Sequence, residues 1–585
     1  MANKGLINAL NGAPEEFKRY HILMEYSENC LSAKDAAEAM GIEISTFRTY
    51  ISQMQKTGQI PGNKKGPKER RKANKYTERI IALRRKNFES DEIANILNKT
   101  ENAEVSSRTV TRILTEQGFK KLSRRSEKEI KRAKILMEKE IDAYPNRCRS
   151  EIKDHKGKII SEDAGVFLFV PIIEELKLQE IAEKIYGTRD ISALSYFLTY
   201  LALKLIGAKR YSRVENYEHD RGLALFAGLN KLPSQSDIHT YHYGLTKDDN
   251  KKMRIAYGKA IRKHIDGKYF NLDFKSIPFF GESDDLQKNR IALSGKVMKS
   301  SLVFLAQDQE SVMFCYSDGD VKKENKDDMV LEFVDYWKDV TGERPEFLIF
   351  DSKVTTYSNL WRLDKEEQVK FLTLRRRGKN LVADINDIPN EDWKTVRMKN
   401  EKRKYRNLKV ADDRTRKTIL DVRDEKGKVT NKLEVRQVII TNNGRDEPTF
   451  MVTNDVELST KDIVELYPPR GRIENGISDE MGFFNLNALP STLGVKRDFN
   501  VLMTQIASSM YKMLAKDIWG FEKAEAEILY NNFVKGGRSV EVLDDKIVVE
   551  LIKKKYTPHL RDAEFMKKEI RASWLGNKKI EFKFV

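Results

Sequence analysis

The chain has 585 residues, of which 40% are hydrophobic and 34% are charged. This length is too great for one hydrophobic core, so we expect several domains, and the composition excludes a disordered polyelectrolyte. Lys and Arg number 107 against 89 Asp and Glu, which gives a net charge of +18. Such a balance favours polyphosphate partners, with an inert basic surface as the alternative.

The charge is uneven, because residues 1–150 hold 31 Lys/Arg and 20 Asp/Glu and therefore 11 of the 18 net charges. The stretch MANKGLINAL lacks the charged start and long apolar centre of a signal peptide. The longest apolar run, 191–208, contains Lys204 and predicts a buried helix rather than a membrane span. Three scattered cysteines exclude a disulfide framework and a zinc ribbon: Cys30, Cys148 and Cys315. We expect a cytoplasmic protein with no membrane partner.

The first predicted domain, residues 1–60, contains two helical stretches separated by a glycine. Apolar positions in LSAKDAAEAMGIEISTFRTYISQMQKTGQI recur at helical spacing on both sides of that glycine. Ser45 is a suitable N-cap for the second helix. Two short helices joined by such a turn describe a helix-turn-helix, whose second helix enters the major groove. We therefore expect Thr46, Arg48 and Thr49 to contact DNA.

A similar helix-turn-helix is predicted at 76–123, after a basic linker at 61–75 whose composition suits an arm lying along phosphates. Ser90 is expected to cap one helix, and Ser106 or Ser107 to cap the recognition helix. The recognition helix carries three candidate DNA contacts: Arg108, Thr109 and Arg112. A pair of unrelated helical hairpins would give the same pattern, and each unit alone is a weak signal.

Residues 124–160 are expected to form a connecting helix and residues 161–265 a helical region. His239 and His242 lie three residues apart in this region, but no carboxylate-rich sequence surrounds them. Their spacing therefore favours a structural role over a metal site.

Residues 266–375 change to strand-like alternation. KYFNLDF, SLVFLAQ and VMFCYS predict three strands, DDMVLEFVDYWKDV a helix, and EFLIFDS a strand buried on both faces. A polar helical stretch and the strand VKFLTLR follow. Three strands, helix, strand, helix, strand is the order of an RNase H-like α/β domain.

Residues 376–460 are rich in strand signals and hold two basic stretches, RRRGK and KNEKRKYRNLK. Residues 461–520 return to helical periodicity and complete the core, and residues 521–585 form a C-terminal region. The predicted fold class is an RNase H-like α/β core, a mixed sheet flanked by helices, with an inserted antiparallel β subdomain. All-α helix-turn-helix domains precede it.

Three acidic residues lie on successive elements of this core. Asp273 is in the first strand, Asp351 directly follows FLIF, and Glu474 lies in a helix beyond the inserted strands. Adjacent strands would present the two aspartates at one crevice, with the later helix packed across it. Three close carboxylates repel one another unless cations bind between them, and Mg²⁺ or Mn²⁺ suits such oxygen ligands. Two such ions activate the attacking oxygen and stabilise the leaving oxygen in phosphodiester chemistry.

Each of these acids also has a plain structural interpretation. Asp273 is then the polar side of an alternating strand, Asp351 a helix N-cap, and Glu474 the partner of Arg470 one turn earlier, in an exposed pair worth only ~0.3–0.5 kcal/mol. Together, on three elements in this order, they favour catalysis. Five other acids in predicted turns are alternatives: Glu282, Asp284, Asp285, Asp318 and Asp320.

From about residue 190 to 515 the chain resembles the DDE transposases of prokaryotic insertion sequences, in the subgroup with a β-sheet inserted before the catalytic glutamate. LDFKSIPFFGE and FLIFDSKVTTYSNL look like the two aspartate strands, and FLTLRRR like the strand before the insertion. YPPRGRIENGISDEM resembles the signature Tyr-x2-Arg-x3-Glu-x6-Lys, matched by Tyr467, Arg470 and Glu474. Met481 stands where the signature has lysine. The cationic contact expected there is then absent or comes from another residue, such as Lys496 or Arg497.

The resemblance implies a cut-and-paste reaction at transposon ends, with Asp273, Asp351 and Glu474 as catalytic metal ligands. Water attacks one strand, and the freed 3′-hydroxyl then attacks another phosphodiester. Tyr467 would contact DNA, and Arg470 would clamp a phosphate by bidentate bonds. The implied partners are the double-stranded terminal inverted repeats, the target DNA and a second copy of the chain in a synaptic complex. The implied location is the prokaryotic cytoplasm, in association with the nucleoid.

Two other functions remain open from the sequence. One is a DNA-binding regulator with a degenerate core, which Met481 supports. The other is an RNase H-like nuclease such as a junction resolvase. A tyrosine recombinase is disfavoured, because prolines adjoin Tyr467 and no Arg/His constellation accompanies it.

Overall fold

The computed structural model divides into two compact units, Met1–Lys75 and Tyr76–Val585. It describes residues 22–57, 76–143 and 157–585, except for gaps at 24–25, 27–31, 102, 104, 120–121, 123–124, 189–190, 281–285, 292–294, 377, 379–380, 383–384, 386–387, 400–404, 414–417, 425, 472, 474–475, 478–481, 488, 490 and 492. The basic linker at 61–75, Cys30, Cys148, Glu474 and Met481 therefore lie outside the described residues.

The first unit contains two helices, α3 (Ala33–Ala39) and α4 (Ile44–Thr57). Ser32 caps α3 by accepting from the Asp35 N–H. Gly41 makes the turn between the helices at a φ of +64°, which is the left-handed region that glycine adopts without steric cost. The buried Phe47 ring holds α4 onto this turn.

Ser45 does not cap α4, contrary to the sequence prediction. The Glu43 carbonyl accepts the first helical bond, from the Phe47 N–H, so α4 begins at Ile44 and Ser45 lies inside its first turn. The candidate DNA contacts Thr46, Arg48 and Thr49 are exposed on α4.

The second unit begins with four helices: α5 (Thr77–Arg85), α6 (Ser90–Glu101), α7 (Ser107–Glu116) and α8 (Glu127–Ala143). Ser106 caps α7 by accepting from the Thr109 N–H, as one of the two sequence alternatives predicted. Ser90 is the first residue of α6 rather than its cap, because the Glu92 carboxylate reaches back to the Glu89 N–H at 2.8 Å. Apolar residues on one face of α7 are buried and hold it in place: Val110, Ile113 and Leu114.

A helical layer follows, in agreement with the sequence prediction for this region. It comprises η2 (Ala164–Phe169), α9 (Val170–Glu175), α10 (Leu178–Ile185), α11 (Ala193–Leu205), η3 (Tyr211–Tyr217), α12 (Arg221–Phe226), α13 (Gln235–His242), α14 (Lys247–Ile261) and η4 (Arg262–His264). Helix α11 is almost wholly buried. Across the described residues, we find no helix that combines the length and the apolar character needed to cross a membrane.

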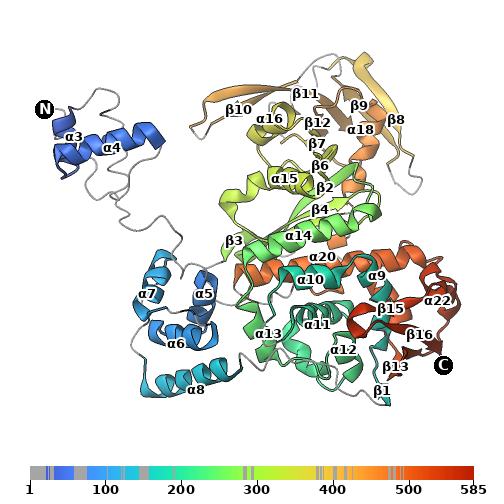
Figure 1. The fold of residues 1–585 in the computed structure, drawn as a ribbon. Helices are drawn as coiled ribbons and strands as arrows, with labels where there is room; N and C mark the ends of the chain where they lie inside the picture. Colours follow the sequence, from blue (N-terminus) through green and yellow to red (C-terminus); the bar gives the residue numbers. More distant parts are fainter. Residues whose placement is uncertain are drawn as a thin grey trace. The chain divides into compact units, whose positions relative to one another are not determined.

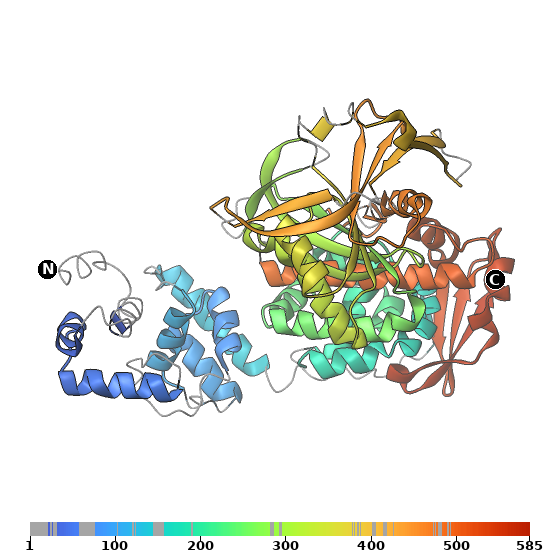
Figure 2. The ribbon, with the colours of Figure 1, turned by 90° about the horizontal axis from the view of Figure 1, so that it is seen from above.

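His242 is buried in this layer among aromatic rings, as the structural interpretation of the histidine pair predicted. Tyr196, Tyr200, Tyr211 and Phe499 all place their ring centroids within 6 Å of its imidazole. The long helix α20 (Gly494–Asp517) lies beside α14 and contacts α11 as well (Figures 1 and 2).

A large mixed sheet of eleven strands lies against α14, α15 and α20. Its first half and the helices between its strands are β2 (Tyr269–Pro278), β3 (Gln287–Arg290), β4 (Val297–Asp308), β5 (Phe314–Val321), η5 (Lys323–Asp328), α15 (Met329–Thr341), β6 (Phe347–Phe350), α16 (Tyr357–Lys365) and β7 (Lys370–Leu374). Strands β2, β6 and β7 are mutually parallel, and β4 is antiparallel to β2 and β5. The order matches the prediction, with the short edge strand β3 in addition.

The inserted strands predicted at 376–460 are present, but they extend the main sheet instead of forming a separate one. They are β8 (Trp393–Arg397), β9 (Asn407–Asp412), β10 (Thr418–Arg423), β11 (Val429–Thr441) and β12 (Thr449–Thr453), with a short η7 (Asn390–Asp392) before them. The physical reason is the free edge of β7, whose residues 372–374 pair with 451–453 of β12. Helix α18 (Thr460–Leu466) and η8 (Pro468–Arg470) follow.

A second, smaller sheet of five strands closes the C-terminal region (red in Figure 2). Its elements are β1 (Lys158–Ile160), α21 (Ala526–Leu529), η9 (Tyr530–Val534), β13 (Gly537–Val542), β14 (Lys546–Leu551), α22 (Thr557–Asp562), η10 (Glu564–Lys567), β15 (Ile570–Ala572), η11 (Ser573–Leu575) and β16 (Lys578–Phe584). Residues 158–160, expected at the end of a connecting helix, pair instead with 539–541 of β13. That pairing joins segments almost four hundred residues apart, so no local pattern reveals it.

Candidate active site

Two of the predicted catalytic acids lie side by side where β6 ends beside β2. Leu272 of β2 pairs with Phe350 of β6 in a parallel register, and Asp273 and Asp351 are the next residues along each strand. Neighbouring strands lie about 4.8 Å apart, so the two aspartates lie at one edge of the sheet. The buried strand FLIF fixes the height of Asp351.

Asp351 does not cap the helix that follows it, which removes the plain structural interpretation of this residue. Thr356 caps α16, because its hydroxyl accepts from the Asn359 N–H at 3.4 Å. The Asp351 carboxylate is half-buried and accepts from the Ser352 hydroxyl at 3.1 Å.

Asp273 contacts the signature arginine. Its Oδ2 lies 3.3 Å from Nη1 of Arg470, and its Oδ1 accepts from the Phe274 N–H at 2.8 Å. The side chains of Asp273 and Arg470 are 21% and 14% exposed, so the pair is only partly screened by water. Arg470 thus links the end of η8 to the first aspartate strand.

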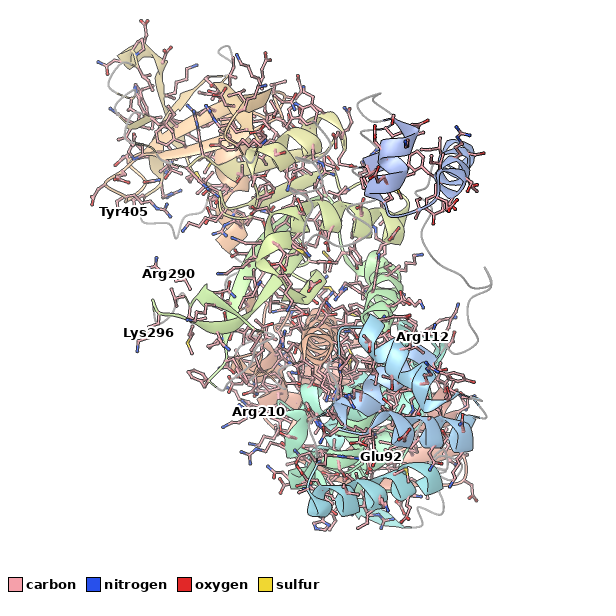
Figure 3. All side chains as sticks on the ribbon, turned by 90° about the vertical axis from the view of Figure 1, so that its left-hand side faces the viewer. Glu92, Arg112, Arg210, Arg290, Lys296 and Tyr405 are labelled. Atoms are coloured by element: carbon pink, nitrogen blue, oxygen red, sulfur yellow. The ribbon has the colours of Figure 1, made fainter. Side chains whose placement is uncertain are left out.

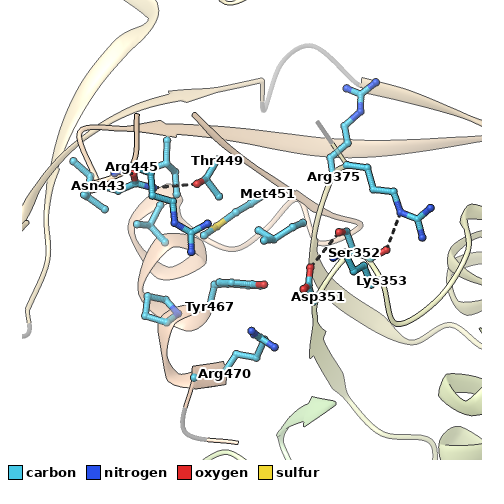
Figure 4. A pocket seen from close by; sticks show the side chains of 17 residues that line it. Asp351, Ser352, Lys353, Arg375, Asn443, Arg445, Thr449, Met451, Tyr467 and Arg470 are labelled. Atoms are coloured by element: carbon cyan, nitrogen blue, oxygen red, sulfur yellow. Dashed lines mark hydrogen bonds between the residues drawn. The ribbon is translucent and has the colours of Figure 1, made fainter. Parts of the chain in front are cut away.

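A cavity of about 710 Å³ opens beside Asp351, and we call it the Asp351 cavity (Figure 4). Cationic side chains from four parts of the chain line it: Lys353, Arg375, Arg376, Arg445 and Arg470. Asp351 is the one acid among the described lining residues, and Asp273 contacts Arg470 of the lining. Five cations around one carboxylate make this cavity suitable for a polyanion.

Tyr467 stands in the Asp351 cavity between two guanidinium groups, those of Arg445 and Arg470 (Figure 4). Arg470 lies 5.8 Å from its ring centroid. Its hydroxyl is buried and has no hydrogen-bond partner among the described residues. Burial raises the pKa of Tyr467, Arg470 opposes this, and the carboxylates of Asp351 and Asp273 add to it. The hydroxyl therefore stays protonated and remains a hydrogen-bond donor.

The segment that contains the third predicted acid packs against the sheet face of Asp273. Ile473 and Ile477 belong to one apolar cluster with Ile277 of β2 and with Val303 and Leu305 of β4. Residues 273 and 277 share a face because side chains alternate along a strand. Glu474 and Met481 lie in this part of the chain but outside the described residues.

Neither residue named as a substitute for the signature lysine lies in the Asp351 cavity. Lys496 is buried with its Nζ 3.8 Å from the ring centroid of Tyr243 and 3.3 Å from Nδ1 of His239. Arg497 is buried and pairs with Asp320. The cations of the cavity come from other segments.

The donor chemistry of the two aspartates fits a hard divalent cation. Carboxylate oxygens are preferred ligands of Mg²⁺ and Mn²⁺, and the described lining residues include no cysteine or histidine, with the Met451 thioether as their one sulfur. Within the described residues, no three His, Cys, Asp or Glu side chains converge as a metal site. Asp273, Asp351 and Glu474 are the residues that would hold such an ion.

The competing acids of the sequence fall in two places. Glu282, Asp284 and Asp285 lie outside the described residues. Asp318 and Asp320 line a different cavity, of about 440 Å³, between β5, α14 and α15, which we call the Asp318 cavity. Asp320 pairs there with Arg497 and lies 3.5 Å from Lys247.

The predicted DNA contacts of the second helix-turn-helix lie on α7. Arg108 is exposed, and Arg112 lies 3.9 Å from Glu116 one turn later. The Thr109 hydroxyl is 3.0 Å from the Ser106 hydroxyl, which ties it to the helix cap.

Four lining cations were not singled out from the sequence: Lys353, Arg375, Arg376 and Arg445. Two of them lie in the run RRR, directly after β7, where Arg375 donates to Gln437 Oε1 at 2.6 Å and Arg376 to the Ser352 carbonyl at 3.3 Å. Arg445 follows the turn NNG that joins β11 to β12. The sequence feature that could have identified these lining arginines is their position directly after a strand or a hairpin turn.

No protein-family model matches the chain, and no curated protein matches it. Among solved structures, the chain is similar to the piggyBac transposase in its synaptic complex with hairpin DNA, with a TM-score of 0.31 and 11% sequence identity. The alignment covers 64% of this chain and 82% of the other. Similarity this low does not establish a shared fold, so the function must be inferred from the residues of this chain.

Proposed function

We propose that the chain is a DNA transposase that cleaves and joins DNA strands at the ends of an insertion sequence, with Asp273, Asp351 and Glu474 as its catalytic acids. The observation that carries the proposal is the pairing of two aspartates at one sheet edge beside a cavity lined by five cations. Carboxylates alone would repel DNA, and cations alone would only bind it.

The strand order supports an RNase H-like core. The spatial order β5-β4-β2-β6-β7, with β2, β6 and β7 parallel and β4 antiparallel to them, accompanies helices after β5 and β6. In open α/β sheets, ligands bind beyond the carboxyl ends of the strands, at the point where the strand order reverses. Here that point lies between β2 and β6, where Asp273 within β2 lies beside Asp351, the residue that follows β6.

The lining cations would hold the DNA backbone. Arg470 and Arg445 flank Tyr467, and guanidinium groups bond phosphate oxygens in a bidentate manner. The Tyr467 hydroxyl is a protonated donor with no described partner, so it is available to a phosphate oxygen. We assign Tyr467 and Arg470 to the phosphate next to the scissile bond.

The reaction class is in-line attack on a phosphodiester. In the first step a water oxygen bonds to phosphorus, the bond to the 3′ oxygen breaks, and the products are a 3′-hydroxyl and a 5′-phosphate. In the second step the oxygen of that 3′-hydroxyl bonds to the phosphorus of a target phosphodiester, the bond from this phosphorus to the target's 3′ oxygen breaks, and the target strand is left with a 3′-hydroxyl. Two Mg²⁺ or Mn²⁺ ions, when bound by the three acids, would act as Lewis acids that stabilise the attacking and leaving oxygens. The surrounding arginines orient the phosphate and offset its charge.

The other expectations extend this proposal. Arg48 and Thr46 on α4, and Arg108, Thr109 and Arg112 on α7, would read the terminal inverted repeats. Two copies of the chain would hold two ends in one synaptic complex. The location would be the prokaryotic cytoplasm, at the nucleoid.

The test is strand nicking by the full chain with Mg²⁺, on a duplex that carries the DNA flanking its gene. Asp351→Asn and Asp273→Asn should lower the nicking rate at least about a hundredfold, or about 2.7 kcal/mol. Asp335→Asn, an acid of the Asp318 cavity, is the matched control and should leave the rate unchanged. Unchanged nicking by Asp351→Asn would refute the site.

The same assay separates the other functions. A DNA-binding regulator would bind the repeats and show no metal-dependent nicking. A junction resolvase would cut branched DNA without preference for repeat ends. Unchanged nicking by Glu474→Gln would remove that residue from the catalytic set while leaving the aspartates in it.

A further inference from the structure

Strand β2 carries Asp273, and together with its partner β4 it continues past the point where the neighbouring strand β6 ends. Strand β2 pairs with β6 only as far as Leu272, but with β4 as far as Pro278. Strand β3, from Gln287 to Arg290, pairs with the outermost part of β4, residues 297–300. We call residues 275–278, 287–290 and 297–300 the wing. At about 3.3 Å per residue, β2 extends roughly 17 Å past Asp273, and β4 extends roughly 26 Å past Leu305, the residue paired with Asp273.

The face of the wing that continues from Asp273 is basic. The registers β2·β4 and β3·β4 run without a break, so alternation places every second residue on the Asp273 face. Four cations lie at those positions: Lys275, Lys288, Arg290 and Lys299. Lys288 and Lys299 are directly opposite each other in the register.

Lys288 therefore lies opposite another cation, and like charges in that position repel each other. Lys288 and Arg290 are exposed, and neither forms an ion pair with a described residue. Figure 3 shows Arg290 and Lys296 projecting away from the body of the second unit. Glu324 accepts from the side-chain amide of Gln287, whose position alternates to the opposite face. Residues 281–285, which join β2 to β3 and include three acids, lie outside the described residues.

We propose that the wing binds the sugar-phosphate backbone of the duplex that flanks the scissile phosphate, with Lys288 and Arg290 as the main contacts. This inference rests on the proposed function, because the wing cations share a sheet face with Asp273 of the candidate active site. Cationic side chains select phosphate, and the exposed Lys288 and Arg290 suit contacts that do not read sequence.

A second copy of the chain is the competing occupant. Phe280 and Val297 are 85% and 65% exposed at the outer end of the wing, and exposed apolar groups also suit a protein partner. The opposed cations favour DNA, because a second copy of a chain with net charge +18 would add repulsion.

The first experiment measures the affinity of the full chain for a fluorescein-labelled duplex of mixed sequence over a series of salt concentrations. It uses the Asp351→Asn background, so that no cleavage occurs and the result does not depend on catalysis. The double variant Lys288→Gln/Arg290→Gln should lower the slope of log K against log salt by about 2, roughly one for each lost phosphate contact.

Lys209→Gln/Arg210→Gln is the matched control, since it removes the same charge from another exposed surface (Arg210 in Figure 3). The control should keep the original slope. A wing variant whose slope equals that of the control overturns the proposal, whether or not the chain cleaves DNA.

The second experiment identifies the occupant directly. A photo-crosslinking amino acid at position 288 should form a covalent adduct with the duplex. Crosslinking to a second protein chain in the presence of DNA, without a DNA adduct, would assign the wing to a protein interface and overturn the proposal. If Asp351→Asn abolishes nicking but the Lys288→Gln/Arg290→Gln variant keeps the original slope of log K against log salt, the proposed function stands and DNA binding by the wing is rejected.

Discussion

The two cavities beside the main sheet differ in the sign of their charge. The Asp351 cavity has five cations and one acid among its lining residues. The Asp318 cavity has three cations and six acids: Asp318, Asp320, Glu332, Asp335, Asp339 and Asp498. If acid content marked the active site, the second cavity would be the candidate. A polyanionic substrate enters the first more readily, because cations there outnumber carboxylates.

The acids of the two cavities also differ in what they contact. In the Asp318 cavity, Asp498 accepts from Arg254 at 2.6 Å and Asp320 pairs with Arg497. Those ion pairs tie α14, α20 and β5 together. In the Asp351 cavity, the carboxylate of Asp351 contacts only a neighbouring hydroxyl among the described residues. A carboxylate engaged in holding the fold is not available for a metal ion, whereas Asp351 is.

The largest expected effect is on stability, from Asp320→Asn. Arg497 has a side chain only 1% exposed, and loss of the carboxylate leaves its charge buried without full compensation. We expect the free energy of unfolding to fall by about 3–5 kcal/mol. Urea denaturation measures this, with the exposed Asp335→Asn as control, expected to stay within about 0.5 kcal/mol of the parent. An unchanged unfolding curve for Asp320→Asn would show that the Asp318 cavity is not structural.

Arg470→Gln should affect catalysis instead of stability. Loss of a charged hydrogen bond to phosphate costs about 1.5–3 kcal/mol, or roughly 10–150-fold in kcat/KM for nicking. The change also removes a guanidinium that competes for Asp273, so the Mg²⁺ concentration needed for half-maximal rate should fall.

The matched control for Arg470 is Arg344→Gln, because Arg344 pairs with Glu367 at 2.9 Å in an exposed position outside both cavities. It should change neither the nicking rate nor the Mg²⁺ requirement. A higher Mg²⁺ requirement in Arg470→Gln would mean that the arginine does not compete with the ion at Asp273.

Tyr467→Phe should produce a smaller effect: kcat/KM for nicking should fall, whereas the free energy of unfolding should stay equal or rise. Its hydroxyl is buried without a described partner, so its removal should leave the free energy of unfolding equal or higher. Loss of one hydrogen bond to phosphate should lower kcat/KM by about 0.5–1.5 kcal/mol, or roughly 2–12-fold. A loss of stability in this variant would indicate a structural role for the hydroxyl.

Much of the core could be predicted from sequence because its signals are local. The alternation of KYFNLDF places Asp273 in a strand and the apolar run FLIF places Asp351 at a strand end, and β2 and β6 carry them there. Parallel strands with intervening helices have few possible orders, so the pairing of the two aspartates also followed.

The features that could not be predicted depend on contacts between segments far apart in the sequence or on single backbone hydrogen bonds. The pairing of β12 with the edge of β7 and that of β1 with β13 join segments with no shared periodicity. Arg445 enters the Asp351 cavity only because β11 and β12 extend the main sheet. The start of α4 was misplaced by two residues, because the Glu43 carbonyl and not the Ser45 hydroxyl begins the helix.

The smallest expected effect is a change in how the free energy of unfolding depends on pH, and it comes from Asp318 in the Asp318 cavity. Burial raises the pKa of Asp318 to about 6, and the neighbouring Asp498 carboxylate adds to this while Arg254 opposes it. Its ordinary value is 3.8, so between about pH 6 and 4 the folded chain holds this proton more tightly than the unfolded chain. The contribution of Asp318 to the free energy of unfolding therefore increases as the pH falls from 7 towards 4, and it decreases as the pH rises.

Asp318→Asn should remove that contribution, because the amide is neutral at every pH and its oxygen can still accept from the Asp320 N–H. We expect the variant to be more stable than the parent at pH 7, with a difference that shrinks towards pH 4. Glu332 also faces this carboxyl, so Glu332→Gln should shift the same curve in the same direction by less. Urea unfolding at pH 7, 5.5 and 4 measures the difference. A variant that is less stable at pH 7 would mean that the Asp318 charge is compensated in the fold, and the contrast with Asp351 would then rest on the surrounding cations alone.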